Sequence, residues 1–342
     1  MKKMTQYILV FVMAVITIGA LSAAGQTEKK QPDKVIVYSS VDQNNTKKLL
    51  DAFTADTGVS ARFMHLSSGD AFTRIDSEKK NPLADVWLGA PNENHILAMS
   101  RGLTLPYKSG ALDKMDGRFK NPDGYWYSFY LNPIAFGVNT GALAKANAPL
   151  PVSWEDLLRP EYKGLIQMPT PQSSGTGYNI IAGFIALWGE EKTFAYLKKL
   201  NRNIQIYTTS GTAPAQAAAV GQCAIAIQFT PGYFEFIEQG YPLKVIFPAE
   251  GVSYEAPAVS IIKGAVHLNA AKKLVDWLLS ERGQEVLTHA GTFFYPVNPG
   301  VAADAHLLPF SSIRIIDFDP QQAAENKKRI VTRWVNEILI FE

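Results

Sequence analysis

The stretch from residue 35 to residue 102 alternates apolar strand-like runs with helical patterns, and this alternation limits the chain to few folds. The runs VIVYSS, VSARFMHL and ADVWLG have the length and apolar character of buried strands. The helical pattern after the first run places Leu49, Leu50 and Phe53 on one face and ends at Gly58. Strands that alternate with helices form parallel sheets through right-handed crossovers. The sequence therefore predicts an α/β fold.

A second block of alternating strands and helices occupies the middle of the chain. The stretch SWEDLLRPEYKGLIQMP predicts a helix followed by a strand, and NIQIYT and CAIAIQF predict two more strands. Extended passages near residues 125–139 and 252–262 connect the blocks, and two such crossings permit hinge closure. We therefore predict two lobes with a cleft between them. Lobe 1 comprises residues 35–130 plus 260–342, and lobe 2 comprises residues 131–259.

The composition fits a globular protein and gives no electrostatic case for a nucleic-acid partner. The chain has 342 residues, which is enough for two lobes with cores of their own. Lys and Arg total 33, and Asp and Glu total 31. A nucleic-acid-binding surface would require a strong basic excess, so we expect no such partner.

The first 24 residues have the three parts of a secretory signal peptide. Lys2 and Lys3 form a positive start, residues 7–20 are almost wholly apolar, and Ser22 and Ala24 supply small residues for cleavage. The apolar run is short for a membrane span, which needs about 20 residues. We predict a cleaved signal peptide over residues 1–24, followed by a polar linker over residues 25–34.

Cysteine usage agrees with an exported protein that is not lipid-anchored. Cys223 is the single cysteine, so no internal disulfide is possible, and no cysteine stands at the predicted cleavage site. The sequence therefore predicts a periplasmic protein.

Hydroxyl-bearing residues, several with glycine beside them, recur between a predicted strand and the helix that follows it. Each group lies at the carboxyl end of a strand, where open α/β sheets bind ligands. The first turn of a helix has unpaired N–H groups and favours negative charge, so several such starts aimed at one cleft would hold an anion without a basic residue. Simple N-capping is the alternative for any one of them. The positions are Ser39, Ser40, Ser67, Ser68, Ser173, Ser174, Gly175, Thr176, Ser210, Gly211 and Thr212.

These residues also carry a family resemblance. The segments VIVYSS, SSGDAFTRI, ADVWLGAPNENHILAMSRGLTLPY, SSGTGYNIIAGFIALWGEEKTFAYLKKL, TTSGTAPAQAAAVGQCAIAI and GVSYEAPAVSIIKGA are together similar to ABC-transporter extracellular solute-binding proteins of the ferric-iron-binding, AfuA-like branch. The resemblance covers roughly residues 34–300. It implies a type II periplasmic binding fold, a monomer that binds its ligand between two lobes, and delivery to a permease with an ATPase.

The resemblance leaves two kinds of ligand open. Ferric-iron members use an adjacent tyrosine pair after the strand that matches CAIAIQF, and here Tyr233 is followed by Phe234. If the ligand is iron, Tyr233, Asp42 and Glu93 are the candidate ligands. Sugar-phosphate members place phosphate on Ser and Thr helix starts and use a Glu in the element that matches Glu255.

We predict that the protein binds a small anion, phosphorylated or phosphonate-like, with no metal and no cofactor. Trp87 could stack on the ligand, and Tyr233 and Glu255 complete the predicted site. The five histidines show no metal-ligand spacing. A secreted hydrolase is the alternative from another class, but no Gly-x-Ser-x-Gly nucleophile motif is present, so we predict no enzyme activity.

Overall fold

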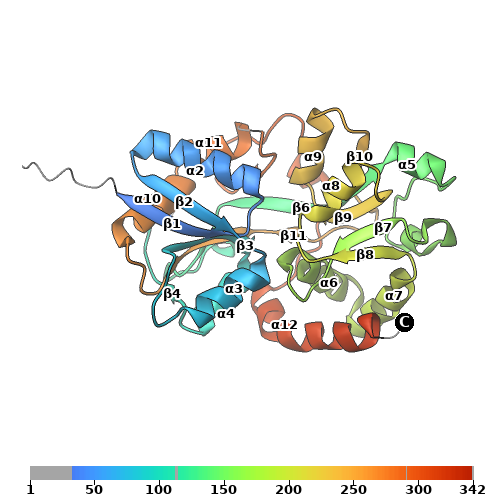
Figure 1. Cartoon of the computed structure of the whole chain (residues 1–342), viewed down its shortest axis with the longest axis horizontal. Coiled ribbons are helices and arrows are strands. Elements are labelled where there is room, and N and C mark those ends of the chain that lie inside the picture. The colour runs from blue at the N-terminus through green and yellow to red at the C-terminus, as the bar shows by residue number, and fades with distance from the viewer. Residues whose placement is uncertain (1–32, 112–114, 290, 341–342) are drawn as a thin grey trace, which may run out of the picture. The chain divides into compact units, whose positions relative to one another are not determined.

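The computed structural model describes residues 33–111, 115–289 and 291–340. The predicted signal peptide and most of the predicted linker lie outside these residues. The described part contains two β-sheets, each flanked by helices, as the α/β prediction requires (Figure 1). None of its helices combines the length and the apolar character that a membrane crossing needs.

The first sheet has six strands in the order β2-β1-β3-β12-β4, and β5 pairs with β12. β1 is parallel to β2 and β3, whereas β12 is antiparallel to β3, β4 and β5. The strands are β1 (Lys34–Ser39), β2 (Ser60–His65), β3 (Val86–Pro91), β4 (Thr104–Leu105), β5 (Tyr127–Ser128) and β12 (Pro257–Ile262). The helices are α2 (Gln43–Thr57), α3 (Ser68–Ser77), α4 (Asn92–Ser100), α10 (Leu268–Leu279) and α11 (Glu281–His289), with a 3-10 turn at Gly117–Phe119.

Both faces of this sheet are covered, which explains why its strands read as continuous apolar runs. Val35 and Val37 pack with α2, α10 and α11 in one hydrophobic cluster. Tyr38, the next residue of β1, packs with α3 and α4 in another. Successive side chains of a strand point to opposite faces, so the two clusters lie on the two sides of the sheet. Gly58 ends α2 in the left-handed conformation with φ 70°, as predicted.

The second sheet has seven strands in the order β10-β6-β9-β7-β8, and β11 and β13 also pair with β6. The strands are β6 (Tyr130–Asn139), β7 (Ile166–Pro169), β8 (Ile204–Thr208), β9 (Ile225–Phe229), β10 (Leu243–Ile246), β11 (Tyr254–Glu255) and β13 (Tyr295–Pro296). The helices are α5 (Thr140–Lys145), α6 (Gly175–Trp188), α7 (Glu190–Asn201), α8 (Ala213–Ala219), α9 (Pro231–Glu238) and α12 (Pro320–Trp334), with short turns at Glu155–Leu158, Pro160–Tyr162, Phe310–Ser312 and Val335–Leu339. β1 and β2 of the first sheet and β7 and β8 of the second point their carboxyl ends toward the opposite lobe (Figure 1).

The chain passes between the sheets within both passages predicted as crossings. β5 of the first sheet ends at Ser128, and β6 of the second begins at Tyr130. β11 pairs with β6, and β12 of the first sheet begins two residues after it. The Phe129 amide donates to the Pro257 carbonyl (3.0 Å) and the Ser128 hydroxyl to the Ala256 carbonyl (2.8 Å), so the two crossings lie side by side.

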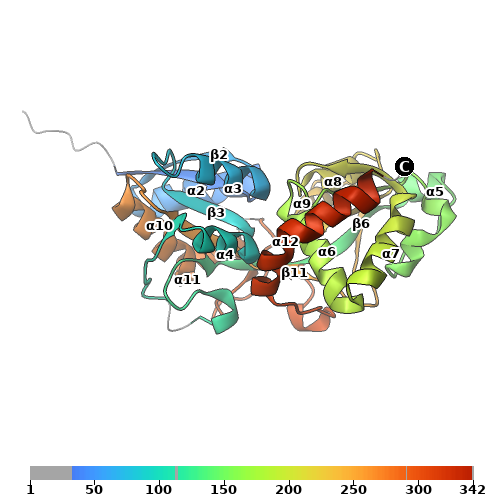
Figure 2. The ribbon, with the colours of Figure 1, turned by 90° about the horizontal axis from the view of Figure 1, so that it is seen from below.

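The C-terminal part departs from the predicted lobe boundaries, which placed all of residues 260–342 in lobe 1. After α11 the chain returns to the second sheet, where Tyr295 of β13 pairs with Leu131 of β6. Ile330 and Trp334 of α12 belong to the hydrophobic core that contains β6. α12 also contacts α4 of the first lobe, and Figure 2 shows it passing from one lobe to the other. The amphipathic pattern of α12 does not by itself identify the surface on which the helix packs.

The predicted helix over SWEDLLRPEYKG is replaced by two short 3-10 turns, Glu155–Leu158 and Pro160–Tyr162. Pro160 lacks an amide hydrogen and disfavours the α conformation of the residue before it, so a helix cannot continue through this position. Arg159 accordingly has an extended conformation with ψ 142°. The strand predicted to follow is present as β7.

Replacing Trp334 tests whether α12 is an integral part of the second core. Its side chain is fully buried, and its ring packs edge to face against the Tyr207 ring with the centroids 5.0 Å apart. We expect Trp334→Ala to lower the free energy of unfolding by about 3–5 kcal/mol, because the cavity it leaves cannot be refilled. Urea denaturation measures this change. Lys328→Ala, at an exposed position of the same helix, is the control. An equal effect of both variants would contradict the assignment of α12 to the core of the second lobe.

Candidate functional site

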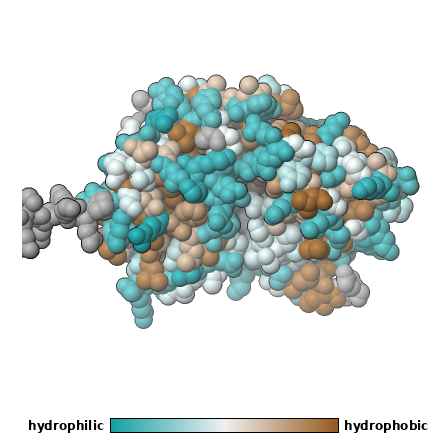
Figure 3. All heavy atoms as spheres, turned by 45° about the horizontal axis from the view of Figure 1, so that its top comes forward, coloured by the Kyte–Doolittle hydropathy of each residue, from teal (hydrophilic) through white to brown (hydrophobic). Residues whose placement is uncertain are grey.

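A cavity of about 400 Å³ lies between the two lobes, at the carboxyl ends of their parallel strands. Its lining includes residues from the starts of α2, α3, α6, α8 and α9 and from the crossing strands β6 and β11. Figure 3, turned so that the top of Figure 1 comes forward, shows mostly hydrophilic residues at the boundary between the lobes. The volume is within the usual range for sites that bind small molecules.

At the start of α3, the two neighbouring serines have different roles. Ser67 is the N-cap, and its hydroxyl accepts a hydrogen bond from the Asp70 amide at 3.2 Å. Ser68 lines the cavity, is 7% exposed, and its hydroxyl has no hydrogen-bond partner in the part of the chain that the structure describes. A cavity-facing hydroxyl without a protein partner is available to bind a ligand in the cavity.

The start of α6 repeats this division. Ser174 caps the helix by accepting from the Gly177 amide at 3.3 Å, and the Ser173 hydroxyl donates to the Thr209 carbonyl at 2.9 Å. Thr176 faces the cavity, is 8% exposed, and its hydroxyl is likewise without a partner among the described residues.

Two further sets of hydroxyl-bearing residues were predicted to form the site, Ser39-Ser40 and Ser210–Thr212, and some of their members line the cavity. Ser39 is buried beside Thr46 (hydroxyl oxygens 2.7 Å apart), whereas Ser40 lines the cavity. The Trp87 indole donates to the Ser40 hydroxyl at 3.2 Å, but Trp87 itself is fully buried and does not line the cavity. The segment Ser210–Thr212 lines the cavity before α8, and its two hydroxyls are 3.1 Å apart.

The glycines of these segments allow the two lobes to touch. The Gly69 amide at the start of α3 donates to the Ser173 carbonyl before α6 at 2.9 Å. A Cβ atom at Gly69 would lie 2.8 Å from that carbonyl oxygen, and one at Gly175 would lie 2.6 Å from the Ser68 hydroxyl. Glycine at these two positions thus lets one helix start approach the other.

The crossing strands supply the floor of the cavity. Tyr130 stacks on Phe294 with ring centroids 4.0 Å apart, and its hydroxyl has no partner within the described residues. The buried Glu255 carboxylate accepts from the Asn132 amide at 2.9 Å. Burial raises the pKa of Glu255 well above its usual value, and the nearby Glu93 adds to the shift. Sequence reasoning assigned Tyr130 to the hinge, and only its place at the first residue of β6 brings it to the cavity.

The residues proposed for an iron site do not come together. Tyr233 is fully buried in the core of the second lobe, where its hydroxyl donates to the carbonyls of Ala226 (2.9 Å) and Ala135 (3.2 Å). Glu93 is buried in the first turn of α4, and neither of its carboxylate oxygens has a partner in the described part of the chain. Asp42 alone of the three lines the cavity. No cluster of three or more His, Cys, Asp or Glu side chains suited to a metal occurs among the described residues.

Two residues that the sequence did not indicate connect the lobes across the cavity. The Asn45 amide of α2 donates to the Glu235 carboxylate of α9. Burial and the nearby Asp42 carboxylate raise the pKa of Glu235 to about 7. Phe236 and Phe294 add apolar surface to the lining.

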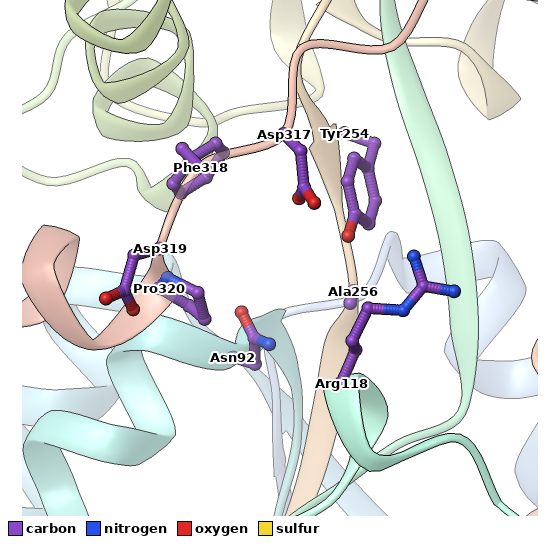
Figure 4. A pocket seen from close by; sticks show the side chains of 8 residues that line it. All are labelled: Asn92, Arg118, Tyr254, Ala256, Asp317, Phe318, Asp319 and Pro320. Atoms are coloured by element: carbon purple, nitrogen blue, oxygen red, sulfur yellow. The ribbon is translucent and has the colours of Figure 1, made fainter.

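A second hollow, of about 380 Å³, lies on the other side of β11 (Figure 4). Tyr254 lines this hollow while Glu255 lines the cavity between the lobes, because successive strand residues point to opposite faces. The Asp317 carboxylate and the Tyr254 hydroxyl point toward each other in Figure 4. Burial and Asp317 raise the pKa of Tyr254 to about 12. None of the predicted helix-start residues reaches this hollow, so we treat the cavity between the lobes as the functional site.

Comparison with known proteins agrees with the two-lobed arrangement. Residues 81–320 match the sequence profile of the family described as bacterial extracellular solute-binding protein. A Haemophilus influenzae protein is 35% identical over 329 residues, which are 94% of either chain. The Fe(3+)-binding periplasmic protein of Serratia marcescens is 24% identical over 93% of this chain and 94% of its own. The solved structure of the periplasmic binding protein AfuA from Actinobacillus pleuropneumoniae, with exogenous fructose-6-phosphate bound, is 36% identical, with a TM-score of 0.87 over 90% of this chain and 99% of that one.

Gly69 offers a test of the contact between the helix starts. Alanine is compatible with the first turn of α3, but its Cβ would strike the Ser173 carbonyl and keep the lobes apart. We expect Gly69→Ala to increase the radius of gyration measured by small-angle X-ray scattering while the melting temperature stays unchanged. Gly117→Ala is the matched control, because a Cβ there meets nothing within 4 Å. An unchanged radius in Gly69→Ala would show that closure does not depend on this contact.

Proposed function

The chain belongs to the bacterial extracellular solute-binding protein family, and on that premise we propose that it captures a small phosphorylated or phosphonate-like anion between its lobes. The protein would act as the periplasmic component of an ABC importer. The bound anion would be delivered to a membrane permease and its ATPase. We propose that it works as a monomer, because each chain contributes both lobes of the site.

The observation that carries this proposal is the convergence of helix starts from both lobes on one cavity, where the Ser68 and Thr176 hydroxyls have no partner among the described residues. Ser68 comes from the first lobe, and Thr176 and the segment Ser210–Thr212 come from the second. The first backbone amides of a helix have no partner within the helix, and the helix dipole favours an anion beside them. A phosphate or phosphonate group has several acceptor oxygens for such donors. The fructose-6-phosphate bound to AfuA supports a phosphorylated ligand.

The strength of such a site follows from the number of its donors. A hydrogen bond contributes about 0.5–1.5 kcal/mol net, and more when the acceptor is charged. Roughly five to eight of them would give a dissociation constant near micromolar, which corresponds to about −8 kcal/mol. Glu255 can assist as a donor while it is protonated, and its raised pKa favours that state.

The alternative ligands and activities have weaker support. Ferric iron prefers phenolate and carboxylate oxygens, but the Tyr233 hydroxyl is committed to two backbone carbonyls inside the second core. A hydrolase would need a base beside one of the cavity serines. No histidine is among the residues that line the described cavity.

Separating the capping serine from the cavity serine tests the proposal. We expect Ser68→Ala combined with Thr176→Val to weaken binding of a phosphorylated ligand by about tenfold or more, because both variants remove unpaired donors. Ser67→Ala is the comparison, since it should cost about 1 kcal/mol of stability through the lost cap and leave the affinity unchanged. Titration calorimetry measures the affinity, after native mass spectrometry of freshly purified protein has identified a retained ligand. Equal affinity of the double variant and the unmodified protein would contradict the anion site.

A further inference from the structure

The ionisable side chains that line the cavity, taken over the described residues, are all acidic apart from the Tyr130 phenol. They are Asp42 from the first lobe, Glu235 from the second, and Glu255 from the crossing strand β11. No lysine, arginine or histidine is among the lining residues. A cavity built only to hold an anion gains nothing from carboxylates, because they repel it. These side chains therefore point to a second chemical group on the ligand.

Asp42 and Glu235 line the cavity from opposite lobes. Asp42 caps α2 by accepting from the amides of Asn44 (2.8 Å) and Asn45 (3.3 Å). Glu235 is in α9 of the other lobe and is held by the Asn45 side-chain amide. Asn45 thus contacts both carboxylates, Asp42 through its backbone amide and Glu235 through its side-chain amide, beside the cavity that both residues line.

Little positive charge is available to this pair. Lys48 of α2 attracts Glu235, but its ammonium group is exposed and donates to the Gly291 carbonyl at 3.0 Å. Glu238, one turn further along α9, adds repulsion. Burial and Asp42 are the main causes of the pKa of about 7 at Glu235. Two carboxylates brought together in a partly dehydrated place are stabilised when a cation enters between them.

Glu255 has a different environment. The Asn132 amide binds its carboxylate, and burial favours its protonated form. It can therefore serve as a neutral donor, and it does not require a cation.

We propose that the ligand is zwitterionic, with a phosphate or phosphonate group at the helix starts and a protonated amine between Asp42 and Glu235. This inference rests on the proposed function, because it names the chemical group at the end of the ligand that lies opposite the phosphate or phosphonate. The amine would donate hydrogen bonds to both carboxylates and neutralise their mutual repulsion. Discrimination would come from the cost of leaving two carboxylates facing each other beside an uncharged ligand.

A series of phosphate monoesters that differ at a single terminal group tests the inference. The probes are ethyl, 2-hydroxyethyl and 2-aminoethyl phosphate, together with the corresponding butyl, 4-hydroxybutyl and 4-aminobutyl phosphates to cover a longer reach. We expect the amine to bind about tenfold or more tightly than the methyl-terminated ester of at least one length, as close charge pairs do. Calorimetry at neutral pH and low salt measures the affinities.

Glu235→Gln is the informative variant, because it keeps the shape and the contact with Asn45 but removes the charge. We expect it to abolish most of the preference for the amine and to leave the affinity for ethyl or butyl phosphate unchanged or improved. Glu238→Gln is the matched control, since it removes one charge from the same helix at an exposed position outside the cavity lining. It should retain the preference.

The outcomes separate this inference from the proposed function. Tight binding of the methyl-terminated esters with no preference for the amine, or tightest binding of the hydroxyl-terminated esters, would overturn the inference and leave the anion site intact. A preference for the amine that survives Glu235→Gln would also overturn it. Failure of every ester to bind would remove the anion site and the inference together.

Discussion

A backbone hydrogen bond from the Gly69 amide to the Ser173 carbonyl joins the two lobes beside the cavity. It forms because glycine leaves room for the carbonyl, and any side chain at this position would occupy the same space. The contact places the start of α3 against the start of α6. Ser68 directly follows the Ser67 cap and Thr176 stands two residues after the Ser174 cap, and both residues line the one cavity. The proposed anion site and the contact between the lobes thus depend on the same two helix starts.

The fold could be read from the sequence where the pattern is local. Alternating strands and helices, Gly58 as a helix end and the two crossings are set by neighbouring residues and appear as predicted. The return of the chain to the second sheet at Tyr295 could not be predicted in this way. A two-residue strand and an amphipathic helix carry no information about which of two cores they join, because either core would bury Trp334 equally well.

The residues of the candidate site could be predicted from the sequence at the helix starts, but not in α9. Doubled hydroxyls indicate more than a cap, and Ser68 and Ser40 do line the cavity. Tyr233 and Glu235 illustrate the limit. Residues two apart on a helix lie about 200° apart around its axis, so one side chain faces the core and the other the cavity. The rotation of α9 is set by how Tyr233 packs against β6, a tertiary contact that the resemblance to iron-binding relatives does not fix.

Among the described residues no basic side chain lines the cavity, and this has a consequence for how the proposed site would work. A buried arginine would attract an anion strongly, but in the closed cleft it would need a permanent partner whenever the ligand is absent. Hydroxyls and backbone amides are neutral, and water can satisfy them when the lobes separate. In the proposed site they would bind an anion in the closed state, where water is excluded, and would lose much of that advantage once the cleft opens. An anion site made of dipoles would therefore be coupled to closure, and release would require that the contacts between the lobes be broken, among them Gly69 to Ser173 and Asn45 to Glu235.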